Sequence, residues 1–347
     1  MTAKLIERTR FAALLQQAEQ LQWTTAHADA LPVLEQALTL ATTDLERYDV
    51  AESLLRGSNC TRGWDLYDLH PSRPVDRLPG IPIWDGDFCP TLVVVADQGF
   101  GDAIQSMRFI PRLSGRAGEI VVALQDKLFE VTSTSPLLAG CTVMPKSRAR
   151  KRTWPSGTRW ERMMSLPAKV PRPDVGPAAP YLVADPDAGP KLPALRDRPL
   201  TVGVAWRTTQ RRIGPNRSVP LHLMRTLIGI DGVRVVPLHR NRDIRGALPG
   251  AEIVTISNFR DTAAVITQCD LVVTADTVTA HLAPALGVPT LICLLHRPDW
   301  RWGTPDNPTT WYAAAELAWQ DERRQWTPVL ARIADRLRDR TISGGQT

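Results

Sequence analysis

The sequence lacks the features that mark membrane, secreted and disulfide-bonded proteins. No apolar run approaches the roughly 18 to 20 residues that a membrane span needs, so we expect no membrane insertion. The N-terminus, MTAKLIERTRF, carries charges where a secretory signal needs an apolar core. The five cysteines form no CxxC pair and no Cys/His cluster, which argues against a disulfide framework and a structural zinc. We therefore expect a cytoplasmic protein.

Several common catalytic motifs are also absent. The sequence has no Walker A loop, no HExxH, no GxSxG and no DxD carboxylate pair of the sort that holds a metal–nucleotide complex. These absences disfavour a P-loop enzyme, a zinc protease, an α/β-hydrolase and a metal-dependent sugar transferase. We expect neither a metal site nor a cofactor.

What is present is the composition of a globular protein with a surplus of basic residues. At 347 residues the chain is long enough for about two domains with cores of their own. Its apolar share of 43% and its charged share of 22% are close to globular averages. The net charge of +6 permits a polyanionic partner without requiring one.

The pattern of apolar residues, glycines and prolines divides the chain into five parts. We expect N-terminal helices over 1–56, a linker or arm over 57–90, an N-terminal α/β domain over 91–199, a C-terminal α/β domain over 200–330, and a C-terminal helix and tail over 331–347. The first part has apolar residues three and four apart and no glycine, which is typical of two or three packed helices. The fold class is therefore α/β with a short helical segment in front.

Short β-branched runs supply the strands of both α/β domains. The first domain shows a βαβ unit, with strands over 91–97 and 119–125 around a helix over 102–113. In the second domain we expect strands over 200–207, 233–239, 251–256, 269–276 and 289–295, and helices over 220–229, 261–268 and 278–286. Ligands of such domains bind beyond the carboxyl ends of the strands, where GFGD, WRTTQRR and ADTVTAH lie.

The segment TADTVTAHLAPALGVPTL, residues 274–291, carries the strongest functional signal. A buried strand ends at Asp276, and Thr277 and Thr279 open a helix that contains His281. A helix N-terminus presents unpaired N–H groups and a partial positive charge, which suits a diphosphate. The threonine hydroxyls add donors, and Asp276 suits a sugar hydroxyl or the orientation of His281. The alternative is an ordinary N-cap followed by a core histidine.

A second signal follows the first strand of the C-terminal domain, in WRTTQRRIGPNRSVP at 206–220. Its loop holds four arginines, Arg207, Arg211, Arg212 and Arg217. Arginine forks bind phosphate oxygens in bidentate fashion, so this loop suits the leaving diphosphate. Ser218 lies beside them, either as a donor contact or as a cap of the next helix. The alternative for the whole segment is a solvated basic loop.

A third signal is DQGFGDAIQ at 97–105. Gly99 and Gly101 permit a tight turn and a close approach of the backbone to a ligand. Asp102 begins the helix that follows, as an N-cap residue or as a general base that deprotonates an acceptor hydroxyl. Gln98, in the same turn, is a candidate acceptor contact.

Two further segments are unusual in composition. Residues 146–172 hold nine basic residues against one acid, with two tryptophans among them. The candidate polyanion-binding residues are Arg148, Arg150, Lys151, Arg152 and Arg159. The alternative is a mobile, solvated loop. Residues 296–312 contain three tryptophans and a tyrosine, which either line a sugar-binding wall or close the second domain against the first.

Together these segments resemble a known family. The matching stretches are ADQGFGDAIQSMRFIPRL (96–113), MMSLP (163–167), PYLVAD (180–185), VGVAWR with NRSVP (202–220), and DLVVTADTVTAHLAPALGVPTL with PDWRWG (270–303). They stand in the same order in the bacterial glycosyltransferases found behind tetratricopeptide repeats. Those enzymes are related to the heptosyltransferase-like, or GT9-like, family and more distantly to O-GlcNAc transferases.

The resemblance implies a GT-B fold of two Rossmann-like domains, with a nucleotide-sugar donor held mainly by the second. It also implies a metal-independent, inverting displacement at the anomeric carbon. Asp102 matches the family's base, and Arg217 falls where the family places a basic residue on the donor phosphates. Asp276, Thr277 and His281 match its donor motif. Fixed cations and a helix dipole then stabilise the leaving group in place of a metal.

The function expected from these observations is transfer of a sugar from a nucleotide sugar to a hydroxyl of a protein or glycan. The short helical segment and the basic stretch depart from the family and favour a compact, negatively charged acceptor. Hydroxymethylated bases of phage-type DNA are therefore an alternative acceptor. A non-catalytic nucleic-acid-binding module of the same fold and a nucleotide-sugar epimerase are two further alternatives.

Overall fold

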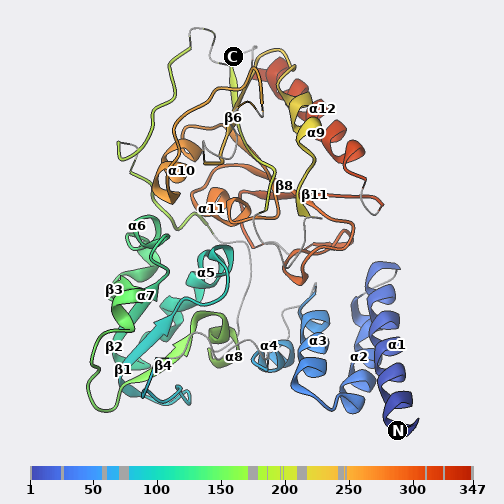
Figure 1. Cartoon of the computed structure of the whole chain (residues 1–347), viewed down its shortest axis with the longest axis vertical. Helices are drawn as coiled ribbons and strands as arrows, with labels where there is room; N and C mark the ends of the chain where they lie inside the picture. The colour runs from blue at the N-terminus through green and yellow to red at the C-terminus, as the bar shows by residue number, and fades with distance from the viewer. Residues whose placement is uncertain are drawn as a thin grey trace.

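The chain forms three parts that meet at a common junction (Figure 1). The structure, a computed structural model, describes residues 2–24, 27–56, 61–69, 78–170, 179–185, 187–195, 197, 199–208, 217–240, 246, 248–308, 311–322 and 325–344. Figure 1 shows the N-terminal helices, the first α/β domain and the second α/β domain as separate lobes. Loops of the second domain reach toward the other two lobes.

The first part consists of helices, as predicted. They are α1 (Thr2–Thr24), α2 (His27–Leu40) and α3 (Asp44–Leu55). Their shared core includes the buried side chains of Phe11, Ala18, Leu34, Ala37 and Val50. A capping box begins α3: the Thr43 hydroxyl accepts from the N–H of Glu46 at 3.2 Å, and Glu46 Oε2 accepts from the N–H of Thr43 at 3.0 Å. The cap fixes the start of the helix that carries Glu52 toward the junction.

The segment predicted as a linker contains a helix, α4 (Thr61–Tyr67). Trp64 and Tyr67 are 3% and 2% exposed. The Trp64 ring meets Phe109 edge-on at 6.4 Å and Trp300 at 5.3 Å between centroids. The prediction of a linker or arm over 57–90 is wrong for these residues, which form a helix with buried aromatic side chains.

Parallel strands in the order β3-β2-β1-β4 form the sheet of the N-terminal α/β domain. They are β1 (Cys89–Val95), β2 (Ala117–Leu124), β3 (Thr142–Pro145) and β4 (Arg159–Arg162). After β1 come α5 (Phe100–Ser106) and the 3-10 segment η2 (Met107–Leu113), which confirms the predicted βαβ unit. Further short helices are α6 (Phe129–Thr132), η3 (Pro136–Leu138), α7 (Lys146–Ala149), η4 (Met163–Ser165) and α8 (Leu166–Lys169).

The basic stretch after β3 is built into this domain. α7 follows β3 directly, and Lys146 Nζ donates to the main-chain oxygen of Ala96 at 3.0 Å. β4 then pairs with β1, and Trp160 is 2% exposed. The alternative of a mobile, solvated loop is wrong for β4, because its pairing with β1 and the buried indole of Trp160 hold it in the sheet. The exposed cations of the stretch are Arg148, Arg150, Lys151 and Arg152.

Parallel strands in the order β11-β8-β7-β5-β6 form the sheet of the C-terminal domain. They are β5 (Leu200–Ala205), β6 (Val233–Pro237), β7 (Leu271–Ala275), β8 (Thr290–Leu294) and β11 (Ala315–Trp319). The helices are α9 (Leu221–Met224), η6 (Arg225–Leu227), α10 (Phe259–Ile266), α11 (Thr279–Ala285), η8 (Trp300–Trp302) and α12 (Thr327–Gly344). A small antiparallel pair joins β9 (Gly303–Thr304) to β10 (Asn307–Pro308).

One predicted strand of this domain is wrong. Residues 251–256 run beside β6, and the N–H of Glu252 donates to Val235 at 2.8 Å, but they do not form a strand. β6 ends at Pro237, which has no N–H to extend a ladder. The fifth strand of the sheet is instead β11, which the sequence patterns did not predict.

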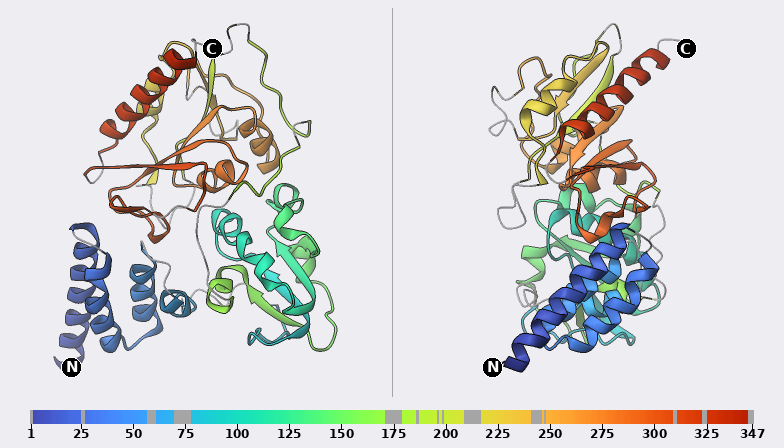
Figure 2. Two further views of the ribbon diagram at one scale, coloured as in Figure 1. Left: turned by 180° about the vertical axis from the view of Figure 1, so that it is seen from behind. Right: turned by 90° about the vertical axis from the view of Figure 1, so that its right-hand side faces the viewer.

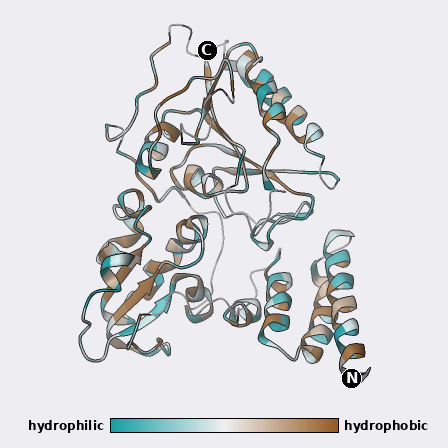
Figure 3. Cartoon of the chain, viewed as in Figure 1, coloured by the Kyte–Doolittle hydropathy of each residue, from teal (hydrophilic) through white to brown (hydrophobic). Residues whose placement is uncertain are grey.

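The carboxyl ends of the two sheets face each other across the junction (Figure 2). α5 follows β1 and α11 follows β7, and Gly101 on α5 lies directly against the ring of His281 on α11. Figure 3 shows hydrophobic residues concentrated along the strands of both sheets. The predicted fold class, two Rossmann-like α/β domains preceded by helices, is confirmed. Among the described helices, none combines the length and the apolar character that crossing a membrane requires.

Candidate active site

A chain of alternating charges crosses the junction between the two α/β domains. Arg217 Nη1 lies 3.1 Å from Asp276 Oδ2, and Arg217 Nη2 lies 3.2 Å from Asp299 Oδ2. Arg301 Nη1 lies 2.6 Å from Asp299 Oδ1. Arg301 Nη2 in turn pairs with Asp102 Oδ1, which belongs to the first domain. Three carboxylates and two guanidinium groups thus link the loop after β7 to the helix after β1.

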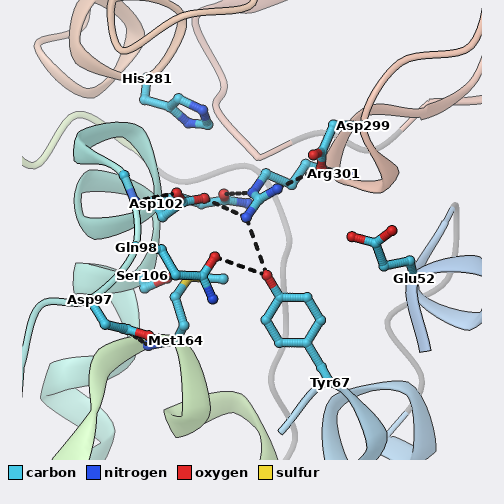
Figure 4. Close-up of polar contacts among 12 residues, drawn as sticks. Glu52, Tyr67, Asp97, Gln98, Asp102, Ser106, Met164, His281, Asp299 and Arg301 are labelled. Carbon is cyan, nitrogen blue, oxygen red and sulfur yellow. Dashed lines mark hydrogen bonds and ion pairs between the residues drawn. The ribbon is translucent and has the colours of Figure 1, made fainter. Parts of the chain in front are cut away.

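Strand ends position these side chains. Asp276 directly follows β7, Asp299 and Arg301 come from the loop after β8, and Asp102 lies in the first turn of α5 after β1. Because carboxyl ends of parallel strands share one edge, residues distant in sequence are collected there. Figure 4 shows Arg301 between Asp102 and Asp299, with Tyr67 and Glu52 reaching in from the N-terminal helices.

Asp102, the predicted base, has two roles open to it. Its Oδ2 accepts from the N–H of Gly99 at 2.8 Å, so Asp102 is the N3 residue of α5 bonded back to the N-cap Gly99, and the alternative that Asp102 is itself the N-cap is wrong. Its other oxygen carries the ion pair to Arg301. The side chain remains 19% exposed, so the cap and the ion pair leave the carboxylate partly accessible. Its role as a base stays a prediction.

Charge pairing controls the ionisation of the buried acids. Burial opposes the charge of Asp299, but Arg301 and Arg217 outweigh it and lower the pKa of Asp299 to about 2. Burial raises the pKa of Asp276, and Arg217 offsets this only in part. Burial also raises the pKa of Glu52, and the neighbouring Asp299 adds to that rise. Asp299 is therefore the firmly ionised centre of the chain of charges.

The arginine loop is divided between the site and the surface. Arg217 is in the site, but it is paired with two carboxylates, so a phosphate has to compete for it. Ser218 Oγ accepts from the N–H of Thr208 at 3.1 Å, and it stabilises the loop turn. Arg207 is exposed. Arg211 and Arg212 lie outside the described residues.

The predicted donor motif after β7 lies at the junction, where Asp276, Thr279 and His281 are buried and Thr277 is half-buried. The Thr277 hydroxyl accepts from the N–H of Thr279 at 3.2 Å, which caps the start of α11 locally. His281 Nδ1 lies 3.0 Å from the Tyr312 hydroxyl. Burial, with a contribution from Arg301, lowers the pKa of His281 to about 3, so the imidazole is neutral at physiological pH. This environment fits the core-histidine alternative, with His281 as a contact between domains.

The structure adds residues that the sequence patterns missed. Tyr67 donates from its hydroxyl to Gln98 Oε1 at 3.1 Å, and Arg301 Nη2 lies 3.5 Å from the same hydroxyl. Gln105 Oε1 accepts from Arg301 Nε at 3.1 Å. Gln98 is therefore held at the junction, in a left-handed backbone conformation with φ of 57°. Asp299 and Arg301 both lie in the motif PDWRWG, whose tryptophans, and not its charged residues, gave the sequence signal.

Aromatic rings close the second domain against the first, as one of the two interpretations of residues 296–312 predicted. The guanidinium carbon of Arg108, on η2, lies 5.0 Å from the Trp311 ring centroid and 5.1 Å from that of Tyr312. The Tyr181 ring lies on the same cation at 5.9 Å. These contacts hold the domains together beside the chain of charges.

The polyanion candidates do not all lie together. Arg159 is the first residue of β4 and pairs with Leu92 of β1. It therefore lies at the amino end of β4, away from the junction. The exposed cations of 148–152 follow the carboxyl end of β3. In the ranges that the structure describes, no three His, Cys, Asp or Glu side chains gather into a group that could hold a metal ion.

Comparison with known proteins finds similar folds but no family. No protein family and no curated protein matches the sequence. The E. coli heptosyltransferase WaaC with ADP is 12% identical with a TM-score of 0.49, over 72% of this chain and 99% of that one. The E. coli ADP-heptose LPS heptosyltransferase II is 13% identical with a TM-score of 0.45, over 74% and 99%.

A glycosyl transferase of family 9 from Veillonella parvula is 15% identical with a TM-score of 0.45, over 69% of this chain and 88% of that one. At these identities and TM-scores the three likenesses decide neither the activity nor the substrates of this chain.

Proposed function

We propose that the chain is a glycosyltransferase that moves a sugar from a nucleoside-diphosphate donor to a hydroxyl of a polymeric acceptor, a protein or a glycan. One observation carries the proposal: a carboxylate of the first domain and two arginines of the second meet where the carboxyl ends of the sheets face each other. A carboxylate suits proton removal, and arginine forks suit a diphosphate. The motif resemblance supports the same function.

In the proposed reaction the acceptor oxygen attacks the anomeric carbon while Asp102 takes the hydroxyl proton. The bond from that carbon to the phosphate oxygen breaks, and its electron pair leaves with the diphosphate. A single displacement of this kind inverts the anomeric configuration. Arg217 stabilises the departing charge, which a fixed cation in a water-poor site does without a metal ion.

The donor has to compete for Arg217, because Asp276 and Asp299 both pair with it. A diphosphate carries more negative charge than either carboxylate and offers several oxygens to the guanidinium fork. Exchange of partners at Arg217 is therefore the expected first event of donor binding.

A thermal-shift panel with UDP, GDP, ADP, CMP and dTDP tests the donor site. A ligand at 100 times its Kd should stabilise the fold by about 2.7 kcal/mol. We expect one nucleotide to stabilise the wild type and Arg217→Ala to abolish that shift. Arg332→Ala is the matched control, because Arg332 is an exposed arginine paired with Asp321.

Other outcomes separate the alternatives. If no nucleotide stabilises the wild type, the proposal is wrong. Sugar transfer at the wild-type rate by Asp102→Asn would exclude the assigned base. Conversion of the donor sugar without an acceptor would instead indicate an epimerase.

A polyanionic acceptor, such as modified DNA, is a second candidate that one surface supports. Arg148 and Lys151 are exposed, and no ion pair to either is formed by the described residues. By contrast, Arg332, Arg336 and Arg338 of α12 pair with Asp321, Glu316 and Asp335. The stretch also lies on the sheet edge that carries Asp102. Asp126 Oδ1 accepts from the N–H of Ser147 at 3.0 Å, and the adjacent Gln125 Nε2 donates to Gly99 at 3.3 Å.

Binding of a DNA duplex as a function of salt tests this acceptor. Each phosphate contact contributes about 0.9 to the slope of log K against log salt. Arg148→Gln with Lys151→Gln should lower that slope by about 2, while Arg332→Gln with Arg338→Gln leaves it unchanged. Binding that is absent, insensitive to salt or unaltered by the first pair would count against a polyanionic acceptor.

A further inference from the structure

Arg301 is a buried cation, and each of its three side-chain nitrogens has a named partner. Its side chain is 9% exposed. Nη1 pairs with Asp299, Nη2 with Asp102, and Nε donates to Gln105 at 3.1 Å. Burial opposes its charge, but Asp102 and Asp299 raise the pKa of Arg301 well above its ordinary value. A buried guanidinium with this many partners is held in one geometry.

The partners of Arg301 come from both sides of the junction. Arg301 belongs to η8 of the second domain, but Asp102 and Gln105 belong to α5 of the first. Nη2 also lies 3.5 Å from the hydroxyl of Tyr67, on α4. Burial raises the pKa of Tyr67 to about 12, so the phenol keeps its proton and donates it to Gln98 Oε1 at 3.1 Å. One side chain therefore sets the position of the α5 carboxylate relative to the second domain (Figure 4).

Asp299 connects Arg301 to the candidate phosphate site. Its two oxygens are divided between the arginines, Oδ1 to Arg301 at 2.6 Å and Oδ2 to Arg217 at 3.2 Å. When a diphosphate takes Arg217, both oxygens of Asp299 become available to Arg301. If Asp299 pairs with both terminal nitrogens of Arg301 in bidentate fashion, its second oxygen comes to Nη2 and competes there with Asp102.

We propose that Arg301 is a positioning residue that ties the base to the donor site. In the absence of donor it holds the Asp102 carboxylate in an ion pair. Donor binding at Arg217 shifts Asp299 onto Arg301 and weakens the ion pair, so that Asp102 can take the acceptor proton while Arg301 still keeps the carboxylate in place. The inference rests on the proposed function, since it concerns the same base and the same donor.

A double-mutant cycle tests whether Arg301 acts through Asp102. The variants are Asp102→Asn, Arg301→Gln, the double variant and Arg301→Lys, with Arg332→Gln as the exposed control. The probe is hydrolysis of the nucleotide sugar whose diphosphate stabilises the wild type, with water as acceptor. Calorimetric titration of that diphosphate gives its Kd for each variant, and circular dichroism checks that each is folded.

We expect Asp102→Asn and Arg301→Gln each to lower kcat by about 100-fold. The kcat of the double variant should equal that of Asp102→Asn alone, to within about twofold. The Kd of the diphosphate should change by less than about threefold in Arg301→Gln, because Arg217 is untouched. Arg301→Lys should recover part of the rate, since it restores the charge without the fork.

Losses that multiply in the double variant would overturn the inference, because Arg301 would then act independently of Asp102. A fall in diphosphate affinity as large as the fall in kcat would overturn it too, by making Arg301 a donor ligand. If Arg301→Gln does not fold, the other two variants test the inference. The double variant removes the unpaired charge of Asp102, and Arg301→Lys keeps the cation. If the wild type binds no nucleotide, the proposed function and this inference both fail. If it binds a nucleotide but the falls in kcat of the single variants multiply in the double variant, this inference alone fails.

Discussion

At the scale of single residues, burial decides what His281 does. Its ring is 5% exposed and lies among Tyr312, Trp302 and Gly101. Protonation of the buried ring would place a second positive charge near that of Arg301, in a site that water does not solvate. The imidazole is therefore neutral, and it packs between the domains with a hydrogen bond to Tyr312. Any contact that it makes with a donor sugar would be a neutral hydrogen bond or a packing contact.

This environment predicts a pH dependence of stability. Burial, aided by Arg301, lowers the pKa of His281 to about 3, whereas the unfolded chain takes up the proton near the ordinary value of 6.5. The contribution of His281 is therefore fully present above pH 6.5 and is lost as the pH falls toward 3, by about 1.4 kcal/mol per pH unit. Urea unfolding between pH 7.5 and 4.5 measures it.

His281→Gln should flatten that pH dependence, because glutamine keeps a hydrogen bond to Tyr312 and does not titrate. His222→Gln is the matched control, since His222 is exposed on α9. Equal slopes for the wild type and His281→Gln would mean that the imidazole is charged in the folded state.

At the scale of elements, the close approach of α5 to α11 depends on a missing side chain. A Cβ at Gly101 would lie 2.5 Å from His281 Cδ2 and 3.0 Å from Nε2. The ring has little room to retreat, since Tyr312 and Trp302 hold it from other sides. Glycine at this position serves the contact between helices as much as the turn before Asp102.

Gly101→Ala should therefore lower stability by about 1–3 kcal/mol through overpacking. Thermal unfolding measures the loss. Gly229→Ala is the matched control, because a Cβ there meets nothing within 4 Å. At that position alanine should be neutral or slightly stabilising, by reducing the freedom of the unfolded chain. Equal melting temperatures for the two variants would show that the helices separate readily at this contact.

At the scale of the whole molecule, α4 joins parts that the chain order keeps apart. The Trp64 ring lies 5.8 Å from Tyr67 on its own helix, 6.4 Å from Phe109 in the first α/β domain and 5.3 Å from Trp300 in the second. Nearby, Arg56 Nη1 donates to the main-chain oxygen of Pro298 at 2.8 Å. α4 therefore packs on both α/β domains, and the end of α3 is tied to the second.

Trp64→Ala should remove about 3–5 kcal/mol of stability, the range for a fully buried large aromatic side chain. Urea unfolding measures the loss, and Trp154→Ala provides the comparison, because Trp154 is only half-buried and lies away from the junction. A loss no larger than that of the control would contradict the view that α4 joins the three parts.

The sequence alone determined the elements whose signals are local. The β-branched runs predicted β1, β2, β5, β6, β7 and β8, because a strand buried on both faces requires such residues along its length. The glycine turn predicted a helix start at Asp102, but the cap was misplaced: Gly99 is the N-cap, and Asp102 bonds back to its N–H from the N3 position. β3 and β4 went unpredicted because each has only four residues, and β11, with the sequence AELAW, because it has no β-branched residue and carries a glutamate.

Only the tertiary structure decided the partners within the candidate site. The sequence marked Asp102, Arg217 and Asp276 separately, but Asp299 and Arg301 link them through ion pairs that span the two domains. No local pattern encodes such pairs, because they form between residues up to about two hundred positions apart once the sheet edges face each other. Burial then fixed which acids are charged, since the pKa of each depends on the neighbours that folding supplies.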